Sequence, residues 1–157
     1  MEKLVELYLS TEKETKKLGR ALAHIAKKED VFALFGTLGV GKSVLARSFI
    51  QELCDCGEVP SPTFTLLQTY ETPDFEIYHF DLYRLKSAEE IFEIGMEEAL
   101  YEGVSLVEWP EKMGGYLPRD IFKIEISTAE KGRKVIISTT SADKNSRLHI
   151  LEELFNE

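Results

Sequence analysis

The chain has 157 residues, of which 43% are hydrophobic and 30% charged, an ordinary balance for a soluble globular protein. We expect residues 1–157 to fold as one domain, which at this length buries about 70% of the unfolded chain's surface. The formal net charge of −9 argues against strong direct nucleic-acid binding, because such binding comes largely from phosphate neutralisation. No apolar run approaches the ~18 residues of a membrane span, and Met1–Glu6 does not resemble a signal peptide. We therefore expect a cytoplasmic protein without a membrane partner.

Hydrophobic periodicity predicts the elements of the first third of the chain. Residues 3–9 alternate in polarity, which is typical of a strand. Residues 11–28 have apolar side chains at helical spacing behind a possible capping box of Thr11 and Glu14. The compact apolar run 30–35 indicates a buried strand, and a helix is expected to follow from residue 44 to about residue 54.

Proline and aromatic residues mark the middle of the chain. Pro60 and Pro62 predict an extended loop, because proline disfavours helix at and before its own position. The β-prone segments 63–72 and 75–83 are predicted to form a hairpin. The remaining expected elements are a short helix from Ser87 toward Gly95, a helical turn up to Tyr101, strands at 104–108, 121–127 and 134–139, and a helix at 141–155. Helices between strands predict an α/β fold with a mainly parallel sheet and antiparallel hairpin additions.

The segment Gly36-Thr37-Leu38-Gly39-Val40-Gly41-Lys42-Ser43 fits G-x-x-x-x-G-K-[ST], the phosphate-binding loop of P-loop NTPases. Its glycines allow backbone N–H groups to approach a phosphate, and the following helix adds the partial positive charge of its N-terminus. Lys42 is expected to contact the outer phosphates, and the Ser43 hydroxyl to ligate Mg²⁺. Because strand, loop and helix follow one another as required, the sequence predicts a three-layer P-loop NTPase fold.

Two acids that end predicted strands compete for the carboxylate that such a site needs beside Mg²⁺. An uninterrupted apolar run ends in Glu108, whereas the run before Asp81 contains polar residues and lies in the predicted hairpin. We favour Glu108 as the Mg²⁺-linked acid and assign Asp81 to the γ-phosphate or the attacking water. The alternative for Asp81 is a salt bridge to Arg84. His79 is interpreted as a core or cross-strand residue rather than a catalytic one.

The loop Ser61-Pro62-Thr63 lies between the expected P-loop helix and the next strand. GTPase switch loops occupy this position and carry a threonine that senses the γ-phosphate and Mg²⁺. The prolines restrict the loop, so it can present Thr63 at little ordering cost. The candidate catalytic residues are therefore Lys42, Thr63, Asp81 and Glu108.

The chain contains a single tryptophan, Trp109, directly after Glu108. If residues 104–107 form a central strand, Trp109 lies just beyond its carboxyl end, where open α/β sheets bind their ligands. We then expect nucleotide and Mg²⁺ to change the surroundings of the indole. The alternative is a tryptophan packed in the core and indifferent to ligand.

Four segments occur in one order in this small acidic chain: the loop 36–43, residues 61–64 (SPTF), residues 79–85 (HFDLYRL) and residues 106–110 (LVEWP). Together they closely resemble the TsaE (YjeE) family of bacterial ATPases, from about Thr11 to Arg133. The resemblance implies ATP hydrolysis that supports the synthesis of threonylcarbamoyladenosine in tRNAs reading ANN codons. It also implies binding to a complex of the TsaD and TsaB proteins, so that tRNA is reached only through this complex.

The same resemblance implies roles for individual residues. Ser43 and Glu108 would hold Mg²⁺, Gly39 to Ser43 would form the phosphate cradle, and Thr63 would belong to a switch-like loop. Thr11 and Arg133 would lie by the nucleotide base. Ser43 departs from the family, in which Thr is commoner, but it keeps the hydroxyl that Mg²⁺ needs.

Three rival interpretations remain. A GTPase is disfavoured because neither Asn145 nor Asn156 begins an Asn-Lys-x-Asp motif, so ATP is preferred. A small-molecule kinase needs an acceptor pocket with a lid, and we find no arginine-rich lid segment. A nucleotide-gated binding module, whose hydrolysis is incidental, also suits the proline-flanked loop and the acidic helices.

Overall fold

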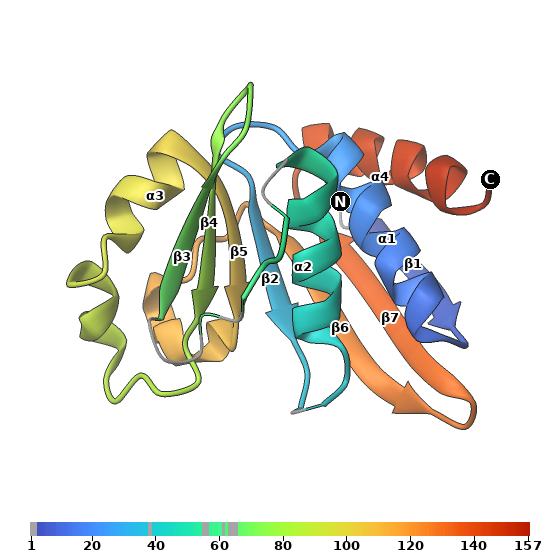
Figure 1. Ribbon diagram of the computed structural model, residues 1–157, viewed down its shortest axis with the longest axis horizontal. Helices are drawn as coiled ribbons and strands as arrows, with labels where there is room; N and C mark the ends of the chain where they lie inside the picture. Colours follow the sequence, from blue (N-terminus) through green and yellow to red (C-terminus); the bar gives the residue numbers. More distant parts are fainter. Residues whose placement is uncertain (1–2, 38, 55–56, 61, 63–65) are drawn as a thin grey trace.

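The computed structural model describes residues 3–37, 39–54, 57–60, 62 and 66–157 (Figure 1). Seven strands in these residues form one sheet of order β1-β7-β6-β2-β5-β4-β3. The strands are β1 (Lys3–Leu9), β2 (Val31–Phe35), β3 (Leu67–Glu71), β4 (Glu76–Asp81), β5 (Gly103–Glu108), β6 (Phe122–Ala129) and β7 (Gly132–Thr139). The α-helices are α1 (Glu12–Ile25), α2 (Lys42–Leu53), α3 (Met96–Glu102) and α4 (Ala142–Phe155), and the 3₁₀ helices are η1 (Ala88–Phe92) and η2 (Pro110–Tyr116).

The centre of the sheet is parallel. Strand β2 pairs in parallel with β6 on one side and β5 on the other, and β5 pairs in parallel with β4. Antiparallel strands extend both sides, with β3 against β4, β7 against β6, and β1 against β7. The prediction of a mainly parallel sheet with antiparallel additions is therefore confirmed.

Each face of the sheet buries apolar side chains against helices, because successive strand residues point to opposite faces. On β2, Phe32 packs against Phe49 of α2, with ring centroids 5.2 Å apart, in a core that also contains side chains of α1 and α4. The neighbouring Val31 and Ala33 belong to a second core with side chains of η1, α3 and η2. The fold thus has three layers, and α1 and α2 lie side by side across one face (Figure 1).

The ends of some elements differ from the sequence-based predictions. Helix α1 ends at Ile25 rather than residue 28, because Ala26 is extended (φ −68°, ψ 139°). At its start Thr11 Oγ1 accepts a hydrogen bond from Glu14 N, but the Glu14 carboxylate accepts from Ser10, so the expected capping box is not reciprocal. Helix η2 was not predicted; it begins at Pro110, a residue suited to a first helical position.

In the part of the chain that the structure describes, no helix is both long enough and apolar enough to cross a membrane.

Candidate nucleotide-binding site

The topology gathers the predicted site residues at one edge of the sheet. Parallel strands β2, β5 and β4 are neighbours, so their carboxyl ends lie together. Asp81, at the end of β4, is the register partner of Glu108, at the end of β5. Helix α2 begins at the same edge, because the glycine-rich loop that joins β2 to α2 is short. The two acids that competed in the sequence are therefore neighbours.

The loop between β2 and α2 has a backbone that requires glycine. A Cβ on Gly36 would lie 2.7 Å from the carbonyl oxygen of Ile126 and 2.8 Å from a methyl group of Val40. Gly41 is the N-cap of α2 and has φ 105°, in the left-handed region that favours glycine. Gly41 offers no capping side chain and the first turn of α2 contains no acid, so the carboxylate beside this N-terminus comes from another element, through the hydrogen bond between Ser43 and Glu108 of β5.

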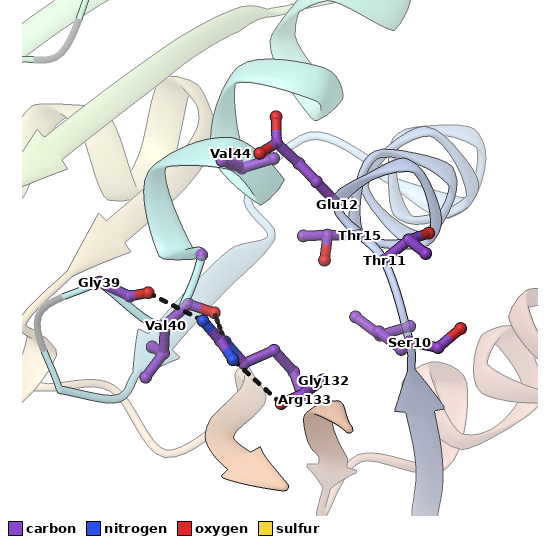
Figure 2. A pocket seen from close by; sticks show the side chains of 11 residues that line it. Ser10, Thr11, Glu12, Thr15, Gly39, Val40, Val44, Gly132 and Arg133 are labelled. Carbon is purple, nitrogen blue, oxygen red and sulfur yellow. Dashed lines mark hydrogen bonds between the residues drawn. The ribbon is translucent and has the colours of Figure 1, made fainter. Parts of the chain in front are cut away.

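Two adjoining cavities share Gly39, Gly41 and Val44 of this segment. The first, of about 320 Å³, is named the acidic cavity here; it is lined by Gly39, Gly41, Lys42, Ser43, Val44, Asp81, Tyr83, Glu108 and Trp109. The second, of about 290 Å³, is named the arginine cavity; it is lined by Leu9, Ser10, Thr11, Glu12, Thr15, Gly39, Val40, Gly41, Val44, Gly132 and Arg133 (Figure 2). The two cavities therefore meet at this loop.

Lys42 is buried in the acidic cavity, where its ammonium group has two contacts. The Nζ atom donates to the carbonyl oxygen of Gly36 at 2.5 Å and lies 3.4 Å from the centroid of the Trp109 ring. Burial lowers the pKa of Lys42, and the carboxylates of Glu108, Glu111 and Asp81 act in the opposite direction. The cation is thus held at the cavity wall between a carbonyl dipole and an aromatic face.

Glu108 is held at both of its carboxylate oxygens. The Oε1 atom accepts from the Ser43 hydroxyl at 3.0 Å, and the Oε2 atom lies 2.7 Å from Nε2 of His79. Glu108 is only 2% exposed and His79 is fully buried. The structure thus joins the two predicted Mg²⁺ residues and adds His79, which sequence analysis had assigned to the core. The sequence feature that indicates a place for His79 near the site is its position two residues before Asp81, on the same face of β4.

Asp81 and Tyr83 form the side of the acidic cavity contributed by β4 and the residues after it. The buried carboxylate of Asp81 accepts from the backbone N–H of Tyr83 at 3.1 Å. The Tyr83 ring packs against Trp109, with centroids 5.0 Å apart. Trp109 has φ 60° and ψ 48°, a left-handed conformation that costs a non-glycine residue on the order of 1–3 kcal/mol. This conformation places the indole in the cavity, beyond the carboxyl end of β5.

The donor set of the acidic cavity fits Mg²⁺. The Ser43 hydroxyl and the carboxylates of Glu108 and Asp81 are hard oxygen ligands of the kind that Mg²⁺ prefers. Within the described residues, no group of three or more His, Cys, Asp or Glu side chains could hold a metal ion by itself. Mg²⁺ sites of this kind draw their remaining oxygens from water and from substrate phosphates.

Arg133 connects the start of β7 to the loop (Figure 2). Its Nε atom donates to the carbonyl oxygen of Val40 at 3.1 Å, its Nη2 atom to that of Gly39 at 3.3 Å, and its Nη1 atom to that of Gly132 at 3.0 Å. Thr11, the N-cap of α1, lines the same cavity. The two residues that the resemblance placed by the nucleotide base therefore lie in one cavity, and Arg133 also contacts the loop.

Two predicted residues, Gly36 and Thr37, are not brought into the cavity linings. Thr37 is exposed, and the carbonyl oxygen of Gly36 accepts a hydrogen bond from Lys42. Neither residue lines the acidic or the arginine cavity. Leu38 lies outside the described residues, and so does Thr63 with its neighbours in the switch-like loop.

The three-layer fold, the loop between β2 and α2, and the Ser43–Glu108 contact define a P-loop protein of the NTPase fold class. Residues 9–136 match the family model described as "Threonylcarbamoyl adenosine biosynthesis protein TsaE". The chain belongs to the TsaE family.

Relatives and a solved structure agree with this assignment. The chain is 40% identical to a tRNA threonylcarbamoyladenosine biosynthesis protein TsaE of Rickettsia felis, over 93% of this chain and 86% of the relative. It is 34% identical to the protein of that name in Haemophilus influenzae, over 92% of this chain and 96% of the relative. The crystal structure of YdiB of Bacillus subtilis has a TM-score of 0.75 and 27% identity, covering 99% of this chain and 97% of that one.

Proposed function

We propose that this protein binds ATP with Mg²⁺ in the acidic and arginine cavities and hydrolyses it to ADP and phosphate. We propose further that this activity serves the biosynthesis of threonylcarbamoyladenosine in tRNA, which is the role that the names of its relatives state. The observation that carries the proposal is the hydrogen bond between Ser43 and Glu108, beside the buried ammonium group of Lys42. An oxygen pair for Mg²⁺ and a cation for phosphate then lie at the N-terminus of α2, as P-loop chemistry requires.

The residues of the acidic cavity have separable roles in this proposal. When nucleotide binds, Lys42 leaves Gly36 and Trp109 and contacts the outer phosphates. These charge-assisted hydrogen bonds offset the free-energy cost of burying its ammonium group. Ser43 and Glu108 would hold Mg²⁺, which when bound would supply positive charge to the phosphate oxygens. Asp81 faces the γ-phosphate or orients the attacking water. Thr63, from the switch-like loop, stays a prediction for sensing the γ-phosphate.

The arginine cavity would take the nucleoside part of ATP. It shares Gly39, Gly41 and Val44 with the acidic cavity but is not lined by Glu108, and Thr11 and Arg133 lie in its wall. The Arg133 guanidinium offers a planar surface and N–H donors to a base. Its hydrogen bonds to Gly39 and Val40 also couple this cavity to the phosphate-binding loop.

We propose that hydrolysis by the isolated chain is slow and that a complex of TsaD and TsaB stimulates it. The described residues that line the acidic cavity include no glutamine or arginine that could position water or stabilise the transferred phosphoryl group. Parts supplied by a partner raise the rate of P-loop enzymes by ~10³–10⁵. The net charge of −9 is consistent with a protein that reaches tRNA through such a partner.

The test is nucleotide binding and hydrolysis by Lys42→Ala. The lost contact to phosphate is worth about 1.5–3 kcal/mol, which corresponds to a roughly 10- to 150-fold loss of ATP affinity by calorimetry. Lys123→Ala is the matched control, because Lys123 also lies near an aromatic ring, that of Phe35, but lines neither cavity. Near-normal ATP affinity of Lys42→Ala would contradict the site. Rapid hydrolysis by the isolated chain, unchanged by TsaD–TsaB, would contradict the role of the partner.

A further inference from the structure

The buried histidine of β4 has a polar contact that the proposed chemistry does not yet use. His79 is fully buried, and its Nε2 atom lies 2.7 Å from Oε2 of Glu108. Its Nδ1 atom has no hydrogen-bond partner among the described residues. A proton on Nε2 therefore gives the ring one satisfied donor, whereas a proton only on Nδ1 would leave a buried N–H without a partner. We assign the hydrogen bond as Nε2–H donating to Glu108.

Packing alone does not account for this side chain. Ile77, two residues earlier on the same face of β4, is apolar and fully buried. An apolar side chain at position 79 would fill the same layer without burying an unpartnered ring nitrogen, which costs free energy. The polar atom that the imidazole does use is directed at a carboxylate of the nucleotide site.

The carboxylate of Glu108 needs such a partner to keep one orientation. The last torsion of a glutamate side chain is broad, so burial of the chain does not by itself fix the plane of the carboxylate. The hydrogen bond from His79 fixes Oε2, and Oε1 then faces Ser43 at 3.0 Å. The donor comes from β4 and the acid from β5, so the orientation is set by two strands in fixed register.

We infer that His79 is a positioning residue that holds the Glu108 carboxylate in the orientation that binds the Mg²⁺ of a bound nucleotide. This inference rests on the proposed function, because it assumes that Glu108 binds nucleotide-linked Mg²⁺. His79 itself contacts neither nucleotide nor metal. Its removal is therefore expected to weaken the effect of Mg²⁺ on nucleotide binding, and to leave metal-free nucleotide binding unchanged.

The experiment compares two amides at position 79. In His79→Gln the amide nitrogen is as many bonds from Cα as Nε2 of histidine, so it reaches Glu108. In His79→Asn the same amide is one methylene shorter and falls short. Calorimetry measures the affinity of a non-hydrolysable ATP analogue in EDTA and in Mg²⁺ for each variant. His24→Asn is the matched control, because His24 also contacts a glutamate, Glu52, through Nε2, but on the exterior of α1 and α2.

Mg²⁺ raises the nucleotide affinity of the wild type by some factor, and we expect this factor to be about 10- to 100-fold smaller in His79→Asn. That is the usual effect of losing the hydrogen-bond partner of a metal ligand. His79→Gln and His24→Asn should keep that gain, and all variants should match the wild type in EDTA. Equal Mg²⁺ gains in His79→Asn and the wild type would overturn this inference alone. Equal losses in EDTA and in Mg²⁺ would also overturn it, since they would indicate a general structural defect. A wild-type protein whose affinity does not respond to Mg²⁺ would overturn the Mg²⁺ assignment, and this inference with it.

Discussion

Replacing Arg133 with methionine should weaken nucleotide binding by loosening the phosphate-binding loop. Methionine keeps much of the aliphatic bulk of arginine but cannot donate to the carbonyl oxygens of Val40 and Gly39. Neither carbonyl is part of a helix or strand, so these hydrogen bonds contribute to the direction of both. The loop of the variant should sample other conformations before ATP arrives.

The magnitude follows from the two hydrogen bonds to the loop. A hydrogen bond that involves a charged group contributes about 1.5–3 kcal/mol, and the longer one, from Nη2 at 3.3 Å, is solvent-exposed and adds little. If the binding conformation of the loop loses about 1.5–3 kcal/mol relative to other loop conformations, ATP affinity falls by at most about 10- to 150-fold. Arg133→Lys should fall between wild type and Arg133→Met, because one ammonium group cannot reproduce the planar fork of donors.

Two measurements separate this mechanism from a direct contact with nucleotide. Calorimetry with ATP and Mg²⁺ gives the loss of affinity, and amide hydrogen exchange of the ligand-free protein reports on the loop. Exchange at Val40 and Gly41 should be faster in Arg133→Met than in the wild type. Reduced affinity with unchanged exchange would refute the loop argument and indicate that Arg133 acts on the ligand itself. Unchanged affinity would refute both.

Three further predictions concern the acids, the tryptophan and the core. Glu108→Ala should lose Mg²⁺-dependent hydrolysis more than it loses ATP binding, whereas Asp81→Ala should keep the Mg²⁺ dependence. If Mg²⁺ titrations show the reverse, Asp81 and not Glu108 is the Mg²⁺-linked acid. Saturating ATP and Mg²⁺ should change the fluorescence emission of Trp109, excited at a wavelength that does not excite the six tyrosines. An unchanged spectrum, with binding confirmed by calorimetry, would contradict the place of Trp109 in the cavity. Arg147→Met should lower the free energy of unfolding by about 1.5–3 kcal/mol in urea denaturation, because the buried carboxylate of Asp30 loses the two hydrogen bonds from Arg147 but keeps Lys144 and the backbone N–H of Lys27. A loss below about 1 kcal/mol would contradict a structural role for this pair.

Local signals were sufficient to predict most of the helices and strands. The glycine-rich loop was found in the sequence because its requirements are local: backbone without Cβ atoms, then lysine and a hydroxyl. The strands of the sheet follow from short apolar runs, and both α1 and α4 start at a residue whose side chain caps them, Thr11 and Ser141. In each case the residues that decide the structure are neighbours in the chain.

The contacts between strands could not be derived in the same way. The sequence presents Asp81 and Glu108 as competitors, because one lies in a hairpin and the other ends a buried run. In the structure β4 is both the second strand of the hairpin and a parallel neighbour of β5, so the two acids are register partners. The contact of His79 with Glu108 depends on the same pairing. Periodicity describes one strand at a time and does not specify its neighbours.

If nucleotide and Mg²⁺ bind in the acidic cavity as proposed, the charges of the cavity predict that they bind cooperatively. Asp81 and Glu108 are both buried beside the N-terminus of α2, and Lys42 is the only cation among the described residues that line this cavity. The phosphates of a nucleotide would bring several negative charges to these carboxylates, so a metal ion that contacts the phosphate oxygens and Glu108 would lower the repulsion. The coupling must be reciprocal: the factor by which Mg²⁺ raises nucleotide affinity equals the factor by which nucleotide raises Mg²⁺ affinity. We therefore expect the proposed site to prefer the metal–nucleotide complex over the free nucleotide, because the carboxylates would oppose phosphates that arrive without a cation.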